Sequence, residues 1–294
     1  MGLKDLTNRK VGVALFYNEL EQYPELVLKN FDSVTPEYEG AFSFVYKDLN
    51  PNWGPCDKIY KFCKENKLAF RMTPTTQVVH RFIPSWMDDP VDKLRDFIEE
   101  IVWRYEECVG FNLVNEFVSD NGLIIEQSYW YQTLGPRYYE TILTWAKESN
   151  PNSKLYIEDH RIQYPRRWHK VYEVAKNLGE LIEGVGIHGH HDLPSPIQLP
   201  NFNNQVEKFK NLGLDVSISE VSLSKGSLKI SDPLFERFYA ALINKFPEDC
   251  PITIWGMLER LRRGRQYGLF KTDGTPNAAY RGIEKGLKQA PKYS

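Results

Sequence analysis

Two patterns of apolar and polar residues alternate along the whole chain. Short runs rich in β-branched residues indicate strands near 11–16, 31–36, 68–72, 110–117, 154–160, 184–192, 215–223 and 251–257. Between most of these runs, apolar residues recur every three or four positions, which is typical of amphipathic helices. Strands and helices that alternate in this way predict a parallel sheet covered by helices.

Helices are expected at about 19–30, around Cys56 to Cys63, over 94–102 with Asp88 as its cap, and at 131–148 and 278–287. Eight strands followed by helices predict an α/β fold, a closed (β/α)8 TIM barrel. A chain of 294 residues without a linker, repeat or low-complexity tract fits one domain, 1–294. The long loop after the third strand carries His80 and Trp86 toward the carboxyl-terminal rim of the barrel.

Two strand patterns end in carboxylates. The run GFNLVNEF ends in Asn115 and Glu116, and the run DVSISEVSL delivers Glu220. A single glutamate at a strand end is more often solvated or paired with an arginine than catalytic. In an α/β barrel, however, the carboxyl ends of the strands carry the chemistry, and glycoside hydrolysis needs two carboxyl groups in different roles. The pair therefore indicates a glycosidase.

Composition narrows the class of partner. A net charge of −2 argues against a nucleic-acid partner, because phosphate contacts require a basic surface. Aromatic residues make up 14% of the chain, and their rings can stack on the apolar faces of sugars, so we expect an oligo- or polysaccharide substrate. The four cysteines fit neither a zinc ribbon nor a disulfide scaffold and are expected to be buried free thiols.

Localisation and assembly are less constrained. No apolar run is long enough for a membrane helix, and residues 1–10 lack the apolar centre of a signal peptide. The protein is therefore expected either to act inside the cell or to be exported after removal of a signal. A monomer that needs no cofactor and no metal is expected.

Eight motifs, taken in order, resemble those of glycoside hydrolase family 10, the retaining endo-β-1,4-xylanases built on a (β/α)8 barrel. They are FDSVTPE (family NSVTPEN), HRFIPSW (HSQTPSW), FNLVNEF (DVVNEA), LYIEDH (LYINDY), GVGIHGHH (GIGxQSH), ISEVSL (ITELDI), ITIWG (VTFWG) and LFKTDGTPNAAYRGI (LFDxxxxPKPAYxGI). The resemblance runs over nearly the whole chain. It implies hydrolysis of β-1,4-linked xylan or a related glycan.

The resemblance also implies roles for individual residues. Glu116 corresponds to the general acid/base, and Glu220 to the nucleophile that forms a covalent glycosyl-enzyme. Asn115 corresponds to the residue that binds the sugar 2-hydroxyl, and His190 to the histidine that holds the nucleophile. The other substrate-binding positions are His80, Glu37 and Trp255. A retaining mechanism implies about 5 to 5.5 Å between the two carboxyl groups.

Departures from the family pattern gather around the expected sugar pocket. Tyr38 and Ala41 stand where the family has Asn and Lys, so one sugar-binding ammonium is missing. His188 replaces a Gln, Ser222 replaces the Asp that orients the histidine, and Arg263 replaces a Trp. We count His188 and Arg263 among the substrate-binding candidates.

The arginines from Arg260 to Arg265 allow two interpretations. Such a run is usually a solvated surface. Alternatively, one or two guanidinium groups bind a carboxylate or sulfate on an acidic glycan.

Two other classes of function stay open. HGHHD, 188–192, and EDH, 158–160, contain enough histidines and carboxylates for a metal-dependent barrel hydrolase, in which His188 and His190 could share a zinc ion. The altered pocket also allows a carbohydrate-binding protein that has lost its activity.

Overall fold

The structure is a computed structural model, and it describes residues 1–48, 50–72, 76–77, 83, 87–161, 164–193, 202–226, 228–262 and 265–289. The strands are β1 (Val11–Leu15), β2 (Ser33–Pro36), β3 (Ala69–Phe70), β4 (Thr76–Gln77), β5 (Phe111–Asn115), β6 (Leu155–Asp159), β7 (Gly184–Asp192), β8 (Asp215–Ser224), β9 (Ile252–Trp255), β10 (Arg260–Arg262) and β11 (Arg265–Tyr267). The helices are α1 (Tyr17–Gln22), α2 (Pro24–Asn30), α3 (Phe42–Val45), α4 (Gly54–Glu65), α5 (Pro90–Arg104), α6 (Tyr129–Leu134), α7 (Tyr138–Ser149), α8 (Pro165–Leu178), α9 (Phe202–Lys210), α10 (Asp232–Ile243) and α11 (Ala278–Gln289). Short 3-10 helices span η1 (Leu3–Leu6) and η3 (Gly179–Leu181).

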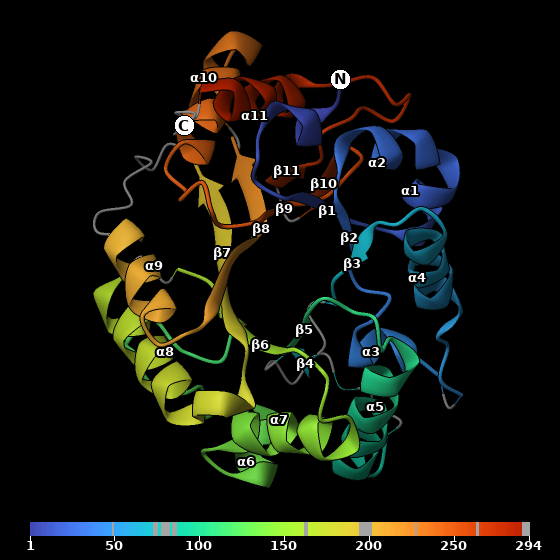
Figure 1. Ribbon diagram of the computed structural model, residues 1–294, viewed down its shortest axis with the longest axis vertical. Helices are drawn as coiled ribbons and strands as arrows, with labels where there is room; N and C mark the ends of the chain where they lie inside the picture. The colour runs from blue at the N-terminus through green and yellow to red at the C-terminus, as the bar shows by residue number, and fades with distance from the viewer. Residues whose placement is uncertain are drawn as a thin grey trace.

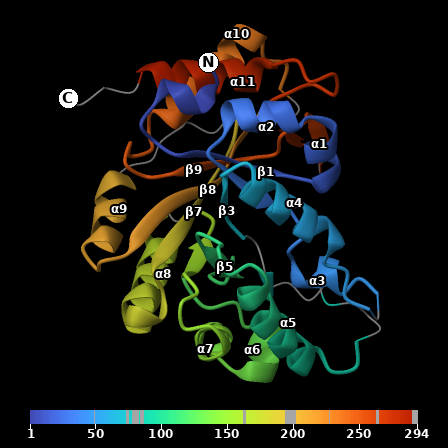
Figure 2. The ribbon, with the colours of Figure 1, turned by 45° about the vertical axis from the view of Figure 1, so that its right-hand side comes forward.

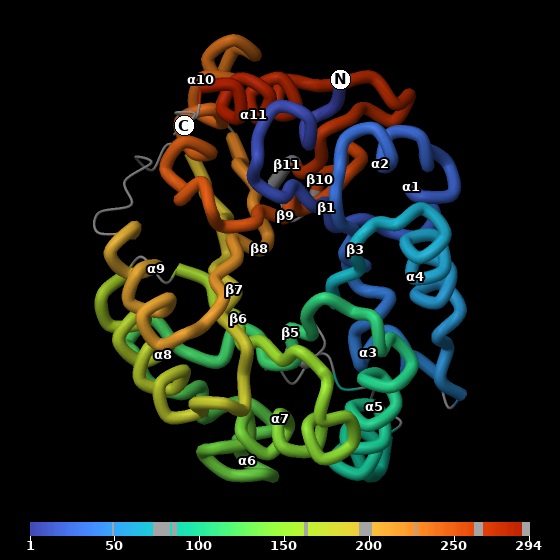
Figure 3. Tube along the Cα trace, in the orientation of Figure 1, coloured from blue at the N-terminus to red at the C-terminus, as the bar shows by residue number. Residues whose placement is uncertain are grey.

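The parallel strands form a ring with helices outside it (Figures 1 and 3). Their order is β3-β2-β1-β9-β8-β7-β6-β5-β4. First and last strands meet where Val11 pairs with Ile252, and a parallel bridge from Met72 to Phe111 joins the end of β3 to β5. Because β3 and β4 together occupy the third position, the ring has eight positions. The predicted (β/α)8 barrel is confirmed.

Burial explains why the strands read as nearly continuous apolar runs. Every residue of β1, β5 and β6 is buried, as expected for strands packed between a filled interior and an outer layer of helices. Figure 2 shows helices on several sides of the strands. All four cysteines are buried free thiols, as predicted, and burial raises the pKa of Cys63 to about 12. Within the described residues, no helix is both long and apolar enough to cross a membrane.

Three details of the predicted helices are wrong. The stretch 19–30 contains two helices, because Pro24 lacks an amide hydrogen and begins a new helix at its first position. The helix expected at 131–148 is likewise divided, at Gly135 with φ of 86° and the proline that follows it. Asp89, rather than Asp88, caps α5, since its side chain accepts the backbone N–H of Asp92.

An aromatic cluster joins α5 to the segment before α4. The Phe97 ring is fully buried, stacks on Trp53 with centroids 5.2 Å apart, and meets the edge of Phe42 at 5.4 Å. Such contacts add to the free energy gained by removing the rings from water.

We expect Phe97→Ala to lower the free energy of unfolding by about 3–5 kcal/mol, because it leaves a cavity in a packed core. The matched control is Phe44→Ala at a ring that is 38% exposed, for which a change below about 1 kcal/mol is expected. Urea titrations of both variants measure the difference. Equal losses in the two variants would contradict this account of the core.

Candidate active site

The two predicted catalytic glutamates lie at the carboxyl-terminal rim of the barrel. Glu116 directly follows β5, and Glu220 lies within β8. Both have left-handed backbones, with φ of 52° and 51° respectively. A non-glycine residue in this region costs about 1–3 kcal/mol, and such strain often marks functional sites. Among the described residues, only Lys67 and Arg161 share this property.

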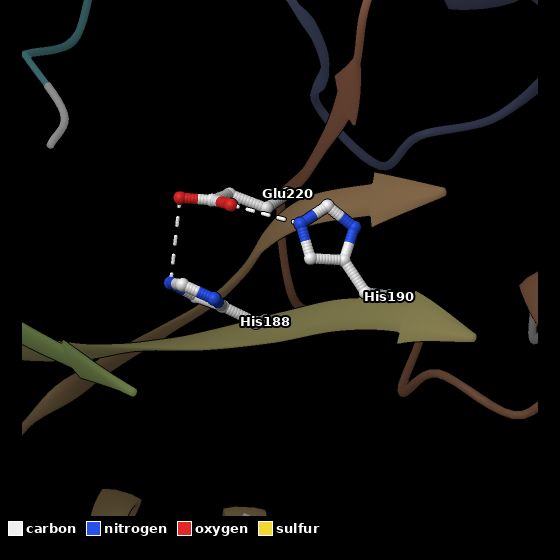
Figure 4. Close-up of side chains that lie close together, drawn as sticks. All are labelled: His188, His190 and Glu220. Carbon is white, nitrogen blue, oxygen red and sulfur yellow. Dashed lines mark hydrogen bonds and ion pairs between the residues drawn. The ribbon is translucent and has the colours of Figure 1, made fainter. Parts of the chain in front are cut away.

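Glu220 is held between two histidines of β7 (Figure 4). Nε2 of His190 lies 2.9 Å from Oε2 of Glu220, and Nε2 of His188 lies 3.4 Å from Oε1. Nδ1 of His190 lies 2.6 Å from the hydroxyl oxygen of Ser222, so this serine occupies the position of an orienting partner. The Glu220 side chain is only 8% exposed. These contacts fix its carboxylate in one orientation.

Glu116 has a more open environment. Its side chain is 41% exposed, and Oε1 lies 3.5 Å from Nδ1 of His160 and 3.7 Å from Nδ1 of His188. Burial, followed by the positive charges of Arg167 and His188, lowers the pKa of His160 to about 3. His160 is therefore neutral beside Glu116 at ordinary pH.

His188 lies between the carboxylates. Its side chain is fully buried, with Nδ1 facing Glu116 and Nε2 facing Glu220 and Glu158. Burial acts to lower the pKa of His188, but the charges of these carboxylates outweigh it and raise the pKa to about 10. The imidazole is therefore a cation.

The separation of about 5 to 5.5 Å between the carboxyl groups of Glu116 and Glu220 stays a prediction.

A buried ion pair supports the backbone around Glu116. Asp159 accepts hydrogen bonds from the backbone N–H of Val118 at 2.9 Å and of His160 at 2.7 Å. Nη1 of Arg167 donates to it at 2.6 Å. Burial raises the pKa of Asp159 to about 7, and the charge of Arg167 opposes this rise. The carboxylate therefore joins the segments that follow β5 and β6.

Two further predicted residues lie beside the glutamates. Asn115 is buried, and within the described part of the chain its Oδ1 accepts no hydrogen bond. A substrate hydroxyl group could therefore donate to this oxygen. The Trp255 ring packs edge-on to His190, with centroids 6.3 Å apart. Asn115 therefore lies next to Glu116 in the chain, and Trp255 lies against the histidine that contacts Glu220.

Glu37, which was predicted to bind the substrate, forms an ion pair within this chain. It is 1% exposed and pairs with Nη2 of Arg260, whose Nη1 donates to Glu19 at 2.9 Å. The Arg260 guanidinium also lies over the Phe16 ring, 4.8 Å from its centroid. Arg260 is therefore engaged by carboxylates of this chain. His80 and Arg263 lie outside the described residues.

Sequence reasoning did not predict how four ionisable residues are arranged around this site. The nearest signal was the motif EDH, at the end of an apolar strand, which we interpreted as part of a family motif and as possible metal ligands. The residues are Glu158, Asp159, His160 and Arg167.

The donors of His188, His190 and Glu220 all lie within 4.8 Å of one another, close enough for a divalent cation to bridge them. A metal ion would have to displace the proton of His188, and the surrounding carboxylates oppose that loss by raising the pKa of this imidazole. We therefore do not assign these residues as metal ligands.

The chain is similar to known proteins in both sequence and fold. Residues 3–285 match the model of the family described as Glycosyl hydrolase family 10. A β-1,4-xylanase of Dictyoglomus thermophilum is 30% identical over 227 residues, which are 73% of this chain and 63% of that protein. An endo-1,4-β-xylanase B of Thermotoga neapolitana is 29% identical over 88% of this chain and 80% of its own length.

Solved structures agree with this match. Native xylanase 10B of Thermotoga maritima superposes with a TM-score of 0.84 at 25% identity, covering 98% of each chain. Xylanase 10B of Thermotoga petrophila, in complex with xylobiose, superposes with a TM-score of 0.83 at 25% identity over 98% of each chain.

The chain spans less than two thirds of the length of some curated relatives, such as 37% of an endo-1,4-β-xylanase A of Caldicellulosiruptor.

The charge on His188 makes a prediction for stability. Because its folded pKa, about 10, lies above the ordinary value of 6.5, its contribution is complete below about pH 6.5 and is lost as the pH rises toward 10. In His188→Gln, the decrease in the free energy of unfolding that deprotonation of His188 causes as the pH rises should be absent. Urea unfolding midpoints between pH 6.5 and 9.5 measure this decrease. The control is His169→Gln, at an exposed histidine, in which the midpoint should change with pH as it does in the wild type. A wild-type slope in His188→Gln would show that His188 is not the source.

Proposed function

Since the chain belongs to glycosyl hydrolase family 10, we propose that it hydrolyses β-1,4 bonds of xylan by double displacement. Glu116 is the general acid/base, and Glu220 is the nucleophile. The observation that carries this assignment is the contrast between the two carboxylates. One is 41% exposed, and the other is 8% exposed and held by two histidines.

The contrast fits the two chemical roles. A general acid must reach the leaving oxygen and exchange protons with water, which an exposed carboxyl group such as Glu116 can do. A nucleophile must meet the anomeric carbon in one orientation, and the contacts of His190 and His188 hold Glu220 still.

The reaction then has two steps. Glu220 attacks the anomeric carbon while the bond to the leaving oxygen breaks, and that oxygen takes the proton of Glu116. Water next attacks the same carbon, gives a proton to Glu116 and releases Glu220 as a carboxylate. Asn115 accepts a hydrogen bond from a sugar hydroxyl through its free Oδ1, and Trp255 forms part of the floor of the site. The configuration of the anomeric carbon is retained.

Neutral xylan is the preferred backbone in this proposal. The alternative of an acidic glycan rested on the arginines at 260–265. Arg260 already pairs with Glu19 and Glu37, which removes it from that role. The alternative now rests on Arg262, Arg263 and Arg265, and a comparison of neutral xylan with glucuronoxylan tests it. The carbohydrate-binding alternative predicts binding without any release of reducing ends.

Replacing either glutamate should separate the two roles. Glu220→Ala should abolish hydrolysis of xylan and of an aryl β-xylobioside. Glu116→Ala should lose about 10²–10⁴-fold on xylan, but far less in the first step with an aryl leaving group that needs no proton. Steady-state and burst kinetics measure this difference.

The control is Glu126→Ala. Glu126 is an exposed glutamate that also follows β5, and its variant should behave as wild type. NMR of the fresh product should show the β-anomer first. Initial release of the α-anomer, or an active Glu220→Ala variant, would refute the mechanism.

Chelation tests the metal alternative. Dialysis against EDTA should leave the rate on xylan unchanged, because the proposed steps use only carboxyl groups and water. Loss of activity that added zinc restores would instead support a metal-dependent hydrolase.

A further inference from the structure

A chain of polar side chains crosses the interior of the barrel beneath Glu220. Nη1 of Arg71 donates to Oδ1 of Asn112 at 2.9 Å, and Nδ2 of Asn112 donates to Oε2 of Glu158 at 2.6 Å. The same Glu158 oxygen lies 3.8 Å from Nε2 of His188, which in turn lies 3.4 Å from Glu220. Charges of opposite sign therefore alternate from β6 through β7 to β8.

The barrel is shaped to hold Glu158. Its side chain is fully buried inside a ring of strands where apolar residues are the rule. On the neighbouring strand, Gly186 makes the space, because a Cβ there would lie 2.9 Å from Cβ of Glu158 and 3.0 Å from its Oε2. A buried carboxylate is costly unless it is paired and hydrogen-bonded, and Glu158 has both kinds of partner.

We propose that Glu158 and His188 form a buried ion pair that positions Glu220 and balances its charge during the reaction. His188 and Glu158 are thus positioning residues, and the proposal rests on the function proposed above. The raised pKa of His188 agrees with a cation at this position. Its ring is faced by charged or titratable groups from each adjoining strand: Glu116 after β5, Glu158 and His160 of β6 and its end, His190 of β7 and Glu220 of β8.

The need for balance follows from the two steps. Glu220 loses its negative charge when it bonds to the anomeric carbon and regains it when water releases the sugar. An uncompensated cation at His188 would stabilise the charged carboxylate, which slows the first step and assists the second. Because Glu158 faces the same imidazole nitrogen, it offsets this bias while the imidazole still orients Glu220.

Single substitutions should therefore act in opposite directions. In Glu158→Gln, the excess positive charge should lower kcat/KM for an aryl β-xylobioside by about tenfold and move the acidic limb of its pH profile down by about one pH unit. In His188→Gln, the uncompensated carboxylate of Glu158 should move the acidic limb of the pH profile up by about one pH unit. The same variant should have a lower kcat on substrates whose turnover is limited by the release of Glu220 from the sugar. The double variant should return the limb to near its wild-type position.

The control is Tyr156→Phe. Tyr156 lies on the same strand as Glu158, and its hydroxyl group donates a partly buried hydrogen bond of 3.0 Å to Asp215 of β8. The substitution removes this hydrogen bond but no charge near Glu220. This variant should lose stability and keep the wild-type pH profile. If both single variants lower kcat and kcat/KM together without moving the limb, or if the double variant is no better than the worse single one, the proposal is wrong.

Two further outcomes keep the test decisive. If neither single variant folds, the double variant decides the test. A folded double variant whose pH profile has the wild-type acidic limb supports the proposal, and a double variant that does not fold overturns it. Nitrogen-15 NMR of the histidine side chains, assigned with the available His188 variant, should show both ring nitrogens of His188 protonated at pH 8. A neutral ring would overturn the proposal. Because this measurement needs no substrate, it separates failure of the ion pair from failure of the proposed xylan hydrolysis.

Discussion

Closure of the parallel sheet on itself is the constraint on which the site depends. Pairing of β1 with β9 and the bridge from Met72 to Phe111 bring the carboxyl ends of all eight positions to one rim. Along β7 and β8, His188 pairs with Ser219 and His190 with Ser222, and the register shifts between the two pairs. A second shift separates Ile218 from Val221 where β8 meets β9. These irregularities surround Glu220, and together they let both histidines face its carboxylate.

The same rim shows how surroundings decide the charge of identical side chains. The rings of His160 and His188 are 6.3 Å apart, yet the pKa of the first is lowered to about 3 and that of the second is raised to about 10. Burial lowers both, but Arg167 is the strongest charge acting on His160, whereas carboxylates surround His188. One histidine can therefore donate or accept a hydrogen bond as a neutral group, and the other acts as a fixed cation.

The sequence was enough to predict what depends on local pattern. The eight strand positions, the barrel, and the placement of Glu116 after one strand and of Glu220 on another all follow from short runs of residues. Contacts between distant segments could not be predicted in the same way. Nothing in the sequence indicated that Glu37 and Arg260, which are far apart in the chain, pair with each other. The prediction that Glu37 binds sugar stays a prediction. Glu158 could not be placed inside the barrel, because the space for it depends on Gly186 of the next strand.

The backbones of both Glu116 and Glu220 are strained, and different contacts support them. Each occupies a left-handed conformation that costs free energy, so packing on either side must hold it there. For Glu116 the nearby support is the network of Asp159 and Arg167, and for Glu220 it is the pair of β7 histidines. The two supports differ in kind: the first fixes the backbone and leaves the carboxyl group in contact with water, while the second fixes the carboxyl group itself. A proton donor and a nucleophile need these two different kinds of restraint, so the contrast supports the proposed two-step hydrolysis over sugar binding alone.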